Sequence, residues 1–207
     1  LFYICCLNAR SIATSPRLHL FEEAIRKIKF DVIALSEVKR TGKKIVTLSS
    51  GIKLFHSTTE RQNCGGVGFA VNSSAHEKYN IKNFHVVSPR ICSLDLLPKN
   101  KQQPKVRLFS LYAPTTSYAD EVYDVFLNTI DVELRRCRVD RFCPMLMGDW
   151  NARIGNANTG DTCIGPVTFG QRNKRGQLVA ELANHWRFKI FNTLFKKPVN
   201  RLWTWRN

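Results

Sequence analysis

The sequence is poor in acidic residues. Its 207 residues hold 16 Asp and Glu against 32 Lys and Arg, which gives a formal net charge of +16. It also lacks a long apolar run, since the opening stretch 1–7 is far too short for a membrane span or a signal-peptide core. We therefore expect no membrane span and no secretion, with the protein in the nucleus or cytoplasm. A hydrophobic content of 43% excludes a wholly disordered chain.

The cysteines lack the spacing of a structural site. None forms a C-x-x-C pair, no zinc-ligand spacing occurs, and an odd number leaves one unpaired. We expect reduced and mostly buried thiols in a reducing compartment. The seven residues are Cys5, Cys6, Cys64, Cys92, Cys137, Cys143 and Cys163.

Acidic residues are scarcest in the C-terminal part. From residue 162 to residue 207 a single acid, Glu181, accompanies nine basic residues. Such an excess favours a polyanionic partner through counterion release, with nucleic acid as the first candidate. A merely solvated basic surface is the alternative. The basic residues are Arg172, Lys174, Arg175, Arg187, Lys189, Lys196, Lys197, Arg201 and Arg206.

Hydrophobic patterning predicts alternating strands and helices, and hence a layered α/β or α+β fold with mixed sheets. Ser15 with Pro16 predicts the start of the first helix, and Ser117 with Asp120 predicts a capping box for the second. A Rossmann fold is disfavoured, because the glycine cluster 65–68 precedes a strand rather than a helix. Strands are expected at 1–7, 31–35, 67–71, 86–96, 106–112, 142–147 and 188–191, and helices around 18–28, 122–137 and 178–186.

Polar residues follow four of these apolar runs where each run ends. They are Asn8, Glu37, Tyr112 and the pair Asp149 and Asn151. The carboxyl ends of strands are where α/β folds commonly place ligand sites. Oxygen ligands of this kind suit Mg²⁺, which binds through one or two carboxylates together with waters and substrate phosphate. Taken singly, each residue also fits a local role as a cap, strand end or turn.

Five short motifs occur in an order and at separations that match a known superfamily. They are Leu7-Asn8-Ala9-Arg10, Ser36-Glu37-Val38-Lys39, Gly65-Gly66-Val67-Gly68-Phe69, Tyr112-Ala113-Pro114 and Gly148-Asp149-Trp150-Asn151-Ala152. Together they resemble the endonuclease/exonuclease/phosphatase superfamily. The stretch 173–195 is similar to one branch of it, the endonuclease domain of non-LTR retrotransposons and their craniofacial-development-like relatives. The resemblance implies one domain over 1–207, with two mixed sheets packed as a sandwich and flanking helices. It also implies Mg²⁺-dependent hydrolysis of a phosphodiester in duplex DNA, with Mn²⁺ as an alternative metal.

The resemblance also implies roles for the residues at the strand ends. Glu37 would be the principal metal ligand, with Asn8 and Asp149 completing the metal site. Asn8 would position metal-bound water or phosphate, and Asp149 would orient or deprotonate the attacking water. Tyr112 would donate a hydrogen bond to the scissile phosphate, and Asn151 would hold a phosphate oxygen.

Phosphate and DNA contacts are expected from basic residues around this site. Thr204 matches a phosphate-contacting threonine of the retrotransposon branch, and Lys39 occupies a position that is often basic in the superfamily. The remaining candidates are carried by loops predicted near the metal: Arg61, Arg153, Arg172, Lys174 and Arg175.

The chain departs from the superfamily pattern after its Thr-Trp motif. The superfamily continues with a metal-site aspartate strand and a closing Ser-Asp-His segment, whereas this sequence stops at Asn207. We therefore expect a domain truncated at its C-terminus, missing its last strands and inactive by itself, whose parent polypeptide continues into a reverse-transcriptase domain. Two other functions stay open: an inositol-phosphate or lipid phosphatase of the same superfamily, and a non-catalytic nucleic-acid-binding remnant.

Overall fold

The chain divides into two units, Leu1–Trp150 and Asn151–Asn207. A computed structural model describes residues 1–41, 44–57, 65–196 and 198. Among the described residues, both sheets and three of the four α-helices belong to the first unit. The expectation of one domain over 1–207 stays a prediction.

The first sheet has the strand order β1-β2-β5-β4-β3. β1 and β2 are parallel, and the other pairs are antiparallel, so the sheet is mixed. All five residues of β2 are buried, as expected for a strand that is covered on both faces. Its strands are β1 (Ile4–Asn8), β2 (Val32–Ser36), β3 (Ile45–Thr47), β4 (Lys53–His56) and β5 (Val67–Val71).

The second sheet has the order β6-β7-β8-β9 and is also mixed, with β8 and β9 parallel. The strand predicted at 86–96, with an interruption at Pro89, proves to be parts of two strands that form an antiparallel hairpin in which Ser88 pairs with Ile91. Pro89 lies in the turn because it has no N–H to donate to a ladder. The strands are β6 (Tyr79–Ser88), β7 (Ile91–Pro98), β8 (Val106–Tyr112) and β9 (Cys143–Asp149).

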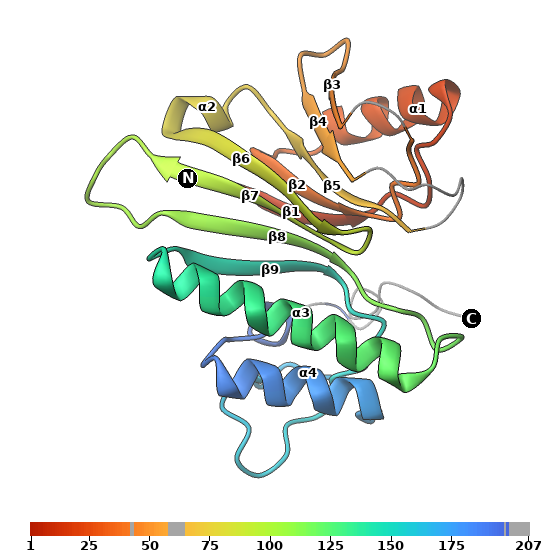
Figure 1. The fold of residues 1–207 in the computed structure, drawn as a ribbon, viewed down its shortest axis with the longest axis vertical. Coiled ribbons are helices and arrows are strands. Elements are labelled where there is room, and N and C mark those ends of the chain that lie inside the picture. The colour runs from red at the N-terminus through yellow and green to blue at the C-terminus, as the bar shows by residue number, and fades with distance from the viewer. Residues whose placement is uncertain (42–43, 58–64, 197, 199–207) are drawn as a thin grey trace. The chain divides into compact units, whose positions relative to one another are not determined.

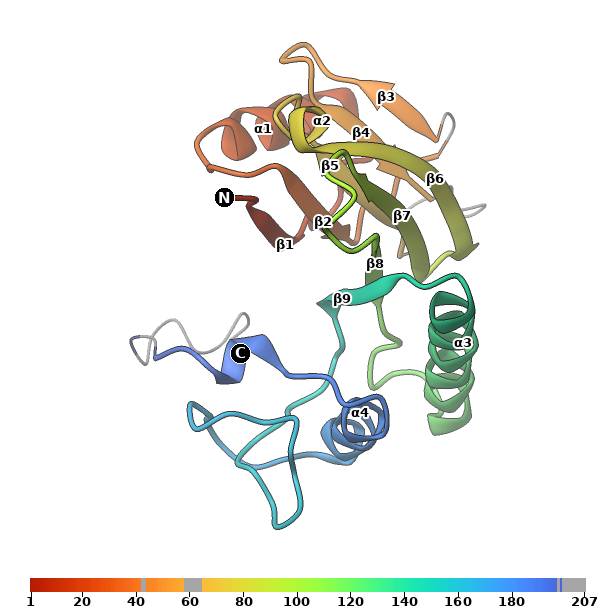
Figure 2. The same ribbon diagram turned by 90° about the vertical axis from the view of Figure 1, so that its left-hand side faces the viewer.

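The two sheets pack face to face, and β2 shows how the sequence achieves this. Val32 and Ala34 contribute to the core between the sheets, together with residues of β5, β7 and β8. Ile33 and Leu35 point to the other face and pack in a cluster with Phe21 and Ile25 of α1 (Ser15–Arg26). Because strand side chains alternate between faces, one apolar run supplies both layers. The expected sandwich with flanking helices is confirmed (Figures 1 and 2).

The helices of the first unit are α1 (Ser15–Arg26), α2 (Ala75–Lys78) and α3 (Asp120–Val139). α3 runs beside β9 (Figure 1). The predicted capping box of α3 is wrong, because its N-cap is Ala119 and the Ser117 hydroxyl instead lies 2.7 Å from that of Thr115. Acidic residues in its first turn and arginines in its last turn stabilise α3, because their charges are opposite to those of the helix dipole at each end.

The second unit contains α4 (Lys174–His185) and a short 3₁₀ turn, η1 (Phe191–Thr193). The strand predicted at 188–191 is wrong. Phe188 and Ile190 both pack against a small cluster around Cys163, as alternate residues of a strand would. Between these two segments, however, a single backbone hydrogen bond is formed, from the Ile190 N–H to the Cys163 carbonyl. None of the helices in the described ranges is long and apolar enough to cross a bilayer.

Candidate active site at the carboxyl ends of the strands

Asn8 and Glu37 meet where the parallel strands β1 and β2 end. Asn8 pairs in register with Ser36, so Glu37 follows at the same edge of the sheet. Nδ2 of Asn8 donates a hydrogen bond to Oε1 of Glu37 at 2.6 Å, and Oδ1 of Asn8 accepts one from the Arg10 N–H at 2.9 Å. Asn8 therefore fixes the orientation of the Glu37 carboxylate.

Lys39 forms an ion pair with the other oxygen of the Glu37 carboxylate. Its Nζ lies 3.2 Å from Oε2 of Glu37, and the two side chains are 24% and 21% exposed. Both oxygens of Glu37 thus have a protein partner while the carboxylate stays reachable from solvent. A cation that binds Glu37 competes with the Lys39 ammonium for this carboxylate.

The backbone around Glu37 is held in a conformation that L-residues rarely adopt. Glu37 and Lys39 both have φ of 54°, and Arg10 and Ser11 in the loop after β1 have φ of 46° and 89°. The two loops are tied together by a 2.8 Å hydrogen bond from the Ser11 N–H to the Glu37 carbonyl. Such left-handed non-glycine residues cost free energy and cluster at functional sites.

The glycine cluster before β5 supports this loop from behind. The Val38 N–H donates to the Gly66 carbonyl, and the Lys39 N–H to the Gly65 carbonyl, both at 3.1 Å. Gly66 has φ of 85°, and a Cβ there would lie 3.0 Å from the Lys39 nitrogen. The motif that resembled the superfamily is therefore a backbone cradle for the Glu37 loop.

Tyr112 and Asp149 end the parallel pair β8 and β9, where they are register partners. The pKa of the Tyr112 phenol is raised by burial and then by the negative charges of Glu37 and Asp149, while Arg90 lowers it. Both carboxylates therefore act on one phenol. The charge of Asp149 also adds to the effect of burial in raising the pKa of the Cys6 thiol on β1.

Four predicted residues are thus brought together in the first unit. Asn8 and Glu37 are in direct contact, and Glu37 and Asp149 both act on Tyr112. Asn151 follows Trp150 as the first residue of the second unit and has φ of 46°. The roles assigned to these residues stay predictions.

The donor set fits a hard cation with few protein ligands. Within the described ranges, no group of three or more His, Cys, Asp and Glu side chains gathers as a metal cage. Mg²⁺ suits such a setting, because it binds through one or two carboxylates and keeps several waters. Glu37 and Asp149 are the carboxylates available, whereas Asn8 turns its Nδ2 toward Glu37 and engages Oδ1 with the backbone. The roles of Asn8, Glu37 and Asp149 as metal ligands stay predictions, and the structure gives the Asn8 amide two protein partners.

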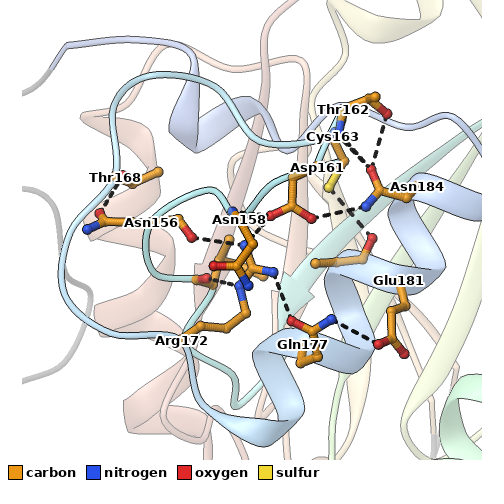
Figure 3. Close-up of polar contacts among 12 residues, drawn as sticks. Asn156, Asn158, Asp161, Thr162, Cys163, Thr168, Arg172, Gln177, Glu181 and Asn184 are labelled. Carbon is orange, nitrogen blue, oxygen red and sulfur yellow. Dashed lines mark hydrogen bonds and ion pairs between the residues drawn. The ribbon is translucent and has the colours of Figure 1, made fainter.

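In the second unit, Arg172 is the centre of an internal network (Figure 3). It forms an ion pair with Asp161 in which the side chains are 8% and 7% exposed. Its Nε donates to the Ile154 carbonyl at 2.7 Å and its Nη1 to Gln177 Oε1 at 2.9 Å. The pKa of Asp161 is lowered mainly by the hydrogen bond from Arg172. Arg172 thus pins the loop after β9 to α4, and Arg175 is also buried.

Asn173 is the N-cap of α4, a position that the sequence reasoning missed. Its Oδ1 caps α4 by accepting from the Gly176 N–H at 2.8 Å, and it also accepts from the Arg153 N–H at 3.0 Å. A Cβ at Gly176 would lie 1.8 Å from the Arg153 carbonyl oxygen, so only glycine fits there. The Asn-x-x-Gly spacing before an apolar helix was the available signal.

A polar pocket of about 510 Å³ lies at the start of α4. It has two basic residues and no acidic residue among those that line it. Lys174 there is exposed, in contrast to Arg172. Two other predicted contacts, Arg61 and Thr204, lie outside the described residues. The lining comprises Asn156, Asn158, Gly170, Gln171, Arg172, Asn173, Lys174 and Gln177.

Comparison with known proteins finds sequence relatives but no matching family model. Craniofacial development protein 2 of Bos taurus is 28% identical over 203 residues, which cover 96% of this chain and 32% of that protein. The protein of the same name from Tragulus javanicus is 27% identical, with 96% and 33% covered. The chain spans about a third of the length of these curated relatives.

Solved structures resemble the chain in fold. The AP endonuclease LMAP from Leishmania major aligns with a TM-score of 0.62 and 11% identity, covering 90% of this chain and 66% of that one. An AP endonuclease from Archaeoglobus fulgidus gives 0.54 and 14%, covering 90% and 71%. The 3′ phosphatase NExo from Neisseria, bound to a product DNA hairpin, gives 0.53 and 13%, covering 75% and 60%.

Proposed function

The chain has the endonuclease/exonuclease/phosphatase fold, and on that premise we propose that it is the catalytic domain of a metal-dependent endonuclease that nicks duplex DNA. One observation carries the proposal. Asn8 and Glu37 end one parallel strand pair, Tyr112 and Asp149 end the other, and both carboxylates act on the Tyr112 phenol.

Glu37 binds the metal, together with Asp149, in this proposal. When bound, Mg²⁺ or Mn²⁺ supplies positive charge that stabilises the charge developing on the phosphate. Asn8 keeps the Glu37 carboxylate oriented through its 2.6 Å hydrogen bond. Asp149 orients the attacking water and accepts its proton.

Tyr112 donates a hydrogen bond to a phosphate oxygen. Its raised pKa supports this role, because the phenol keeps its proton throughout the neutral range. A donor that is in place before the reaction stabilises charge without reorganisation. Asn151 is proposed to hold a second phosphate oxygen.

Duplex DNA is the proposed substrate. The net charge of +16 favours a polyanion, and the fold neighbours include proteins named as AP endonucleases and a phosphatase bound to a DNA hairpin. Lys174 and Arg153 are the proposed phosphate contacts in the second unit, with Lys39 beside Glu37. The Arg172 side chain is only 8% exposed and serves first to hold α4 and its loop, and Arg175 is buried.

Nicking of supercoiled plasmid tests the proposal. A longer polypeptide that carries residues 1–207 and the closing segments of the superfamily should convert supercoiled to relaxed DNA with Mg²⁺ or Mn²⁺ and not with EDTA. Glu37→Gln and Asp149→Asn should abolish nicking, whereas Glu23→Gln, at an exposed position of α1, should leave it unchanged. The 207-residue chain is assayed in parallel, and the resemblance predicts weaker nicking from it.

The other outcomes of this assay identify the competing functions. Release of inorganic phosphate from inositol phosphates without nicking would establish the phosphatase function instead. Salt-dependent DNA binding without turnover of either substrate would establish a binding remnant. The retrotransposon-type context, with a reverse-transcriptase domain and a nuclear or cytoplasmic location, stays a prediction for the parent polypeptide.

A further inference from the structure

Helix α3 carries a second apolar row besides the one that packs on the sheet. Its buried face is formed by residues that include Tyr123, Phe126 and Ile130. Four valines lie elsewhere on the helix and are strongly exposed: Val122 by 41%, Val125 by 64%, Val132 by 47% and Val139 by 81%. Single exposed apolar residues are normal on a protein surface, but an aligned row of four marks an interaction surface.

The spacing of the row is that of a coiled-coil seam. Val122 and Val125 are three residues apart, and Val132 and Val139 follow Val125 at intervals of seven, as positions a and d of a heptad do. Polar residues occupy the two intervening a positions. The Thr129 hydroxyl donates to the Val125 carbonyl at 2.7 Å, and Arg136 pairs with Glu133 within the helix, so both polar groups already have a partner. Valine is also a poorer helix former than most residues found on helix surfaces, so an exposed row of it weakens the isolated helix.

Charge along α3 is divided between its two ends. The acids Asp120, Glu121 and Asp124 lie in the first five residues, and Arg135, Arg136 and Arg138 lie in the last five. A second α3 in parallel orientation would place like charges together. An antiparallel copy places the acidic end of each helix on the basic end of the other.

The residues that flank the valine row are arranged as an antiparallel pair of helices requires. Glu121 and Arg135 are two heptads apart on the same side of the seam, with Asn128 midway between them. Arg135 is 67% exposed and already pairs with Asp131 within the helix. In an antiparallel pair, Glu121 of each copy faces Arg135 of the other copy across the seam.

We propose that α3 is a self-association surface through which two copies of this chain pack antiparallel along the valine row. Twenty residues make a seam of roughly 30 Å. The pair would carry two copies of the candidate site in a fixed two-fold relationship. This inference does not depend on the proposed nuclease activity.

Sedimentation equilibrium of the 207-residue chain tests the proposal, at concentrations up to about 100 μM. The wild-type chain should dimerise, and Val125→Glu with Val132→Glu should give a monomer with unchanged circular dichroism. Leu20→Glu, which replaces an exposed apolar residue of α1, should leave the dimer intact. A monomeric wild-type chain would overturn the proposal, as would a dimer that survives both valine substitutions.

Exchanging the charges at positions 121 and 135 distinguishes antiparallel pairing from non-specific hydrophobic association. Glu121→Arg alone and Arg135→Glu alone should each weaken the dimer roughly tenfold, because each creates two like-charge contacts. The double variant should recover wild-type affinity. Loss of affinity that simply adds in the double variant would rule out the antiparallel register.

Discussion

The amide of Asn8 donates a 2.6 Å hydrogen bond to Oε1 of Glu37, across the parallel pair of β1 and β2. Asn8→Ala removes this bond, while the Lys39 ion pair to the Glu37 carboxylate remains. Loss of a group that orients a metal ligand typically costs 10- to 100-fold, so we expect metal-dependent nicking to fall by roughly that factor. A Mg²⁺ titration of nicking should show a higher half-saturating concentration. Unchanged Mg²⁺ dependence would mean that Asn8 serves only to end β1.

Lys39→Met tests the competition between Lys39 and the metal for Glu37. The ion pair is partly exposed, so its loss should change the free energy of unfolding by less than about 1 kcal/mol. Without the ammonium, Glu37 should bind Mg²⁺ more tightly, and isothermal titration calorimetry should show this as a lower Kd. Weaker Mg²⁺ binding in Lys39→Met would assign the lysine to the metal site itself.

Tyr112→Phe removes one hydroxyl and keeps the ring under Arg90, whose guanidinium carbon lies 5.5 Å from the ring centroid. The melting temperature should therefore stay close to that of the wild type. Removing one donor to a developing oxyanion commonly costs on the order of 10²–10³ in rate, and single-turnover nicking should fall by that order. Full activity in Tyr112→Phe would exclude the phenol as a donor to the phosphate.

The Arg172–Asp161 pair makes the second unit sensitive to acid. Because Arg172 lowers the folded-state pKa of Asp161, the pair contributes its full stability above the unfolded-state pKa, near 4, and loses it as pH falls through the folded-state pKa. Asp161→Asn should remove this acid transition, as followed by the fluorescence of Trp186 on lowering pH. Breaking the nearly buried pair with Arg172→Met should cost about 3–5 kcal/mol at neutral pH.

Gly148 is the tightest backbone position of the candidate site. It has φ of 139°, and a Cβ there would lie 2.0 Å from the Leu111 carbonyl oxygen on β8. Gly148→Ala should therefore separate β8 from β9 and prevent folding of the first unit. Gly51→Ala is the matched control, because Gly51 also has positive φ but no atom lies within 4 Å of its would-be Cβ. Only the backbone cost of roughly 1–2 kcal/mol should appear there in urea unfolding.

Strong periodicity and strand-end polarity were enough to predict most of the first unit. The apolar run of β2 and the alternation of β8 led to the correct strands in the two sheets. The polar residues that follow them come close enough for the charge of Glu37 to raise the pKa of Tyr112. Local signals failed where a tertiary contact decided the outcome. Ser117 pairs with Thr115 instead of capping α3, and Phe188 and Ile190 pack on Cys163 without a partner strand.

The burial of basic residues was a second feature that could not be predicted from the sequence. Arg172 and Arg175 were predicted to contact DNA because loops expected near the metal carry them, yet Arg172 is paired inside the second unit by Asp161, eleven residues earlier. No pattern of charges along the chain distinguishes such an arginine from a solvated one. The support of the Glu37 loop by Gly65 and Gly66 also needed the fold, since β3 and β4 separate them in sequence.

The left-handed backbone at Glu37 and Lys39 has a consequence for how such chains diverge. Selection for folding alone would favour glycine or asparagine at both positions, because these residues adopt positive φ with little strain. A lineage that keeps glutamate and lysine there retains side chains that its fold does not need. A lineage released from catalysis should drift toward Glu37→Gly and become more stable as it does so. The identity of residue 37 is therefore a record of whether the site is still under selection.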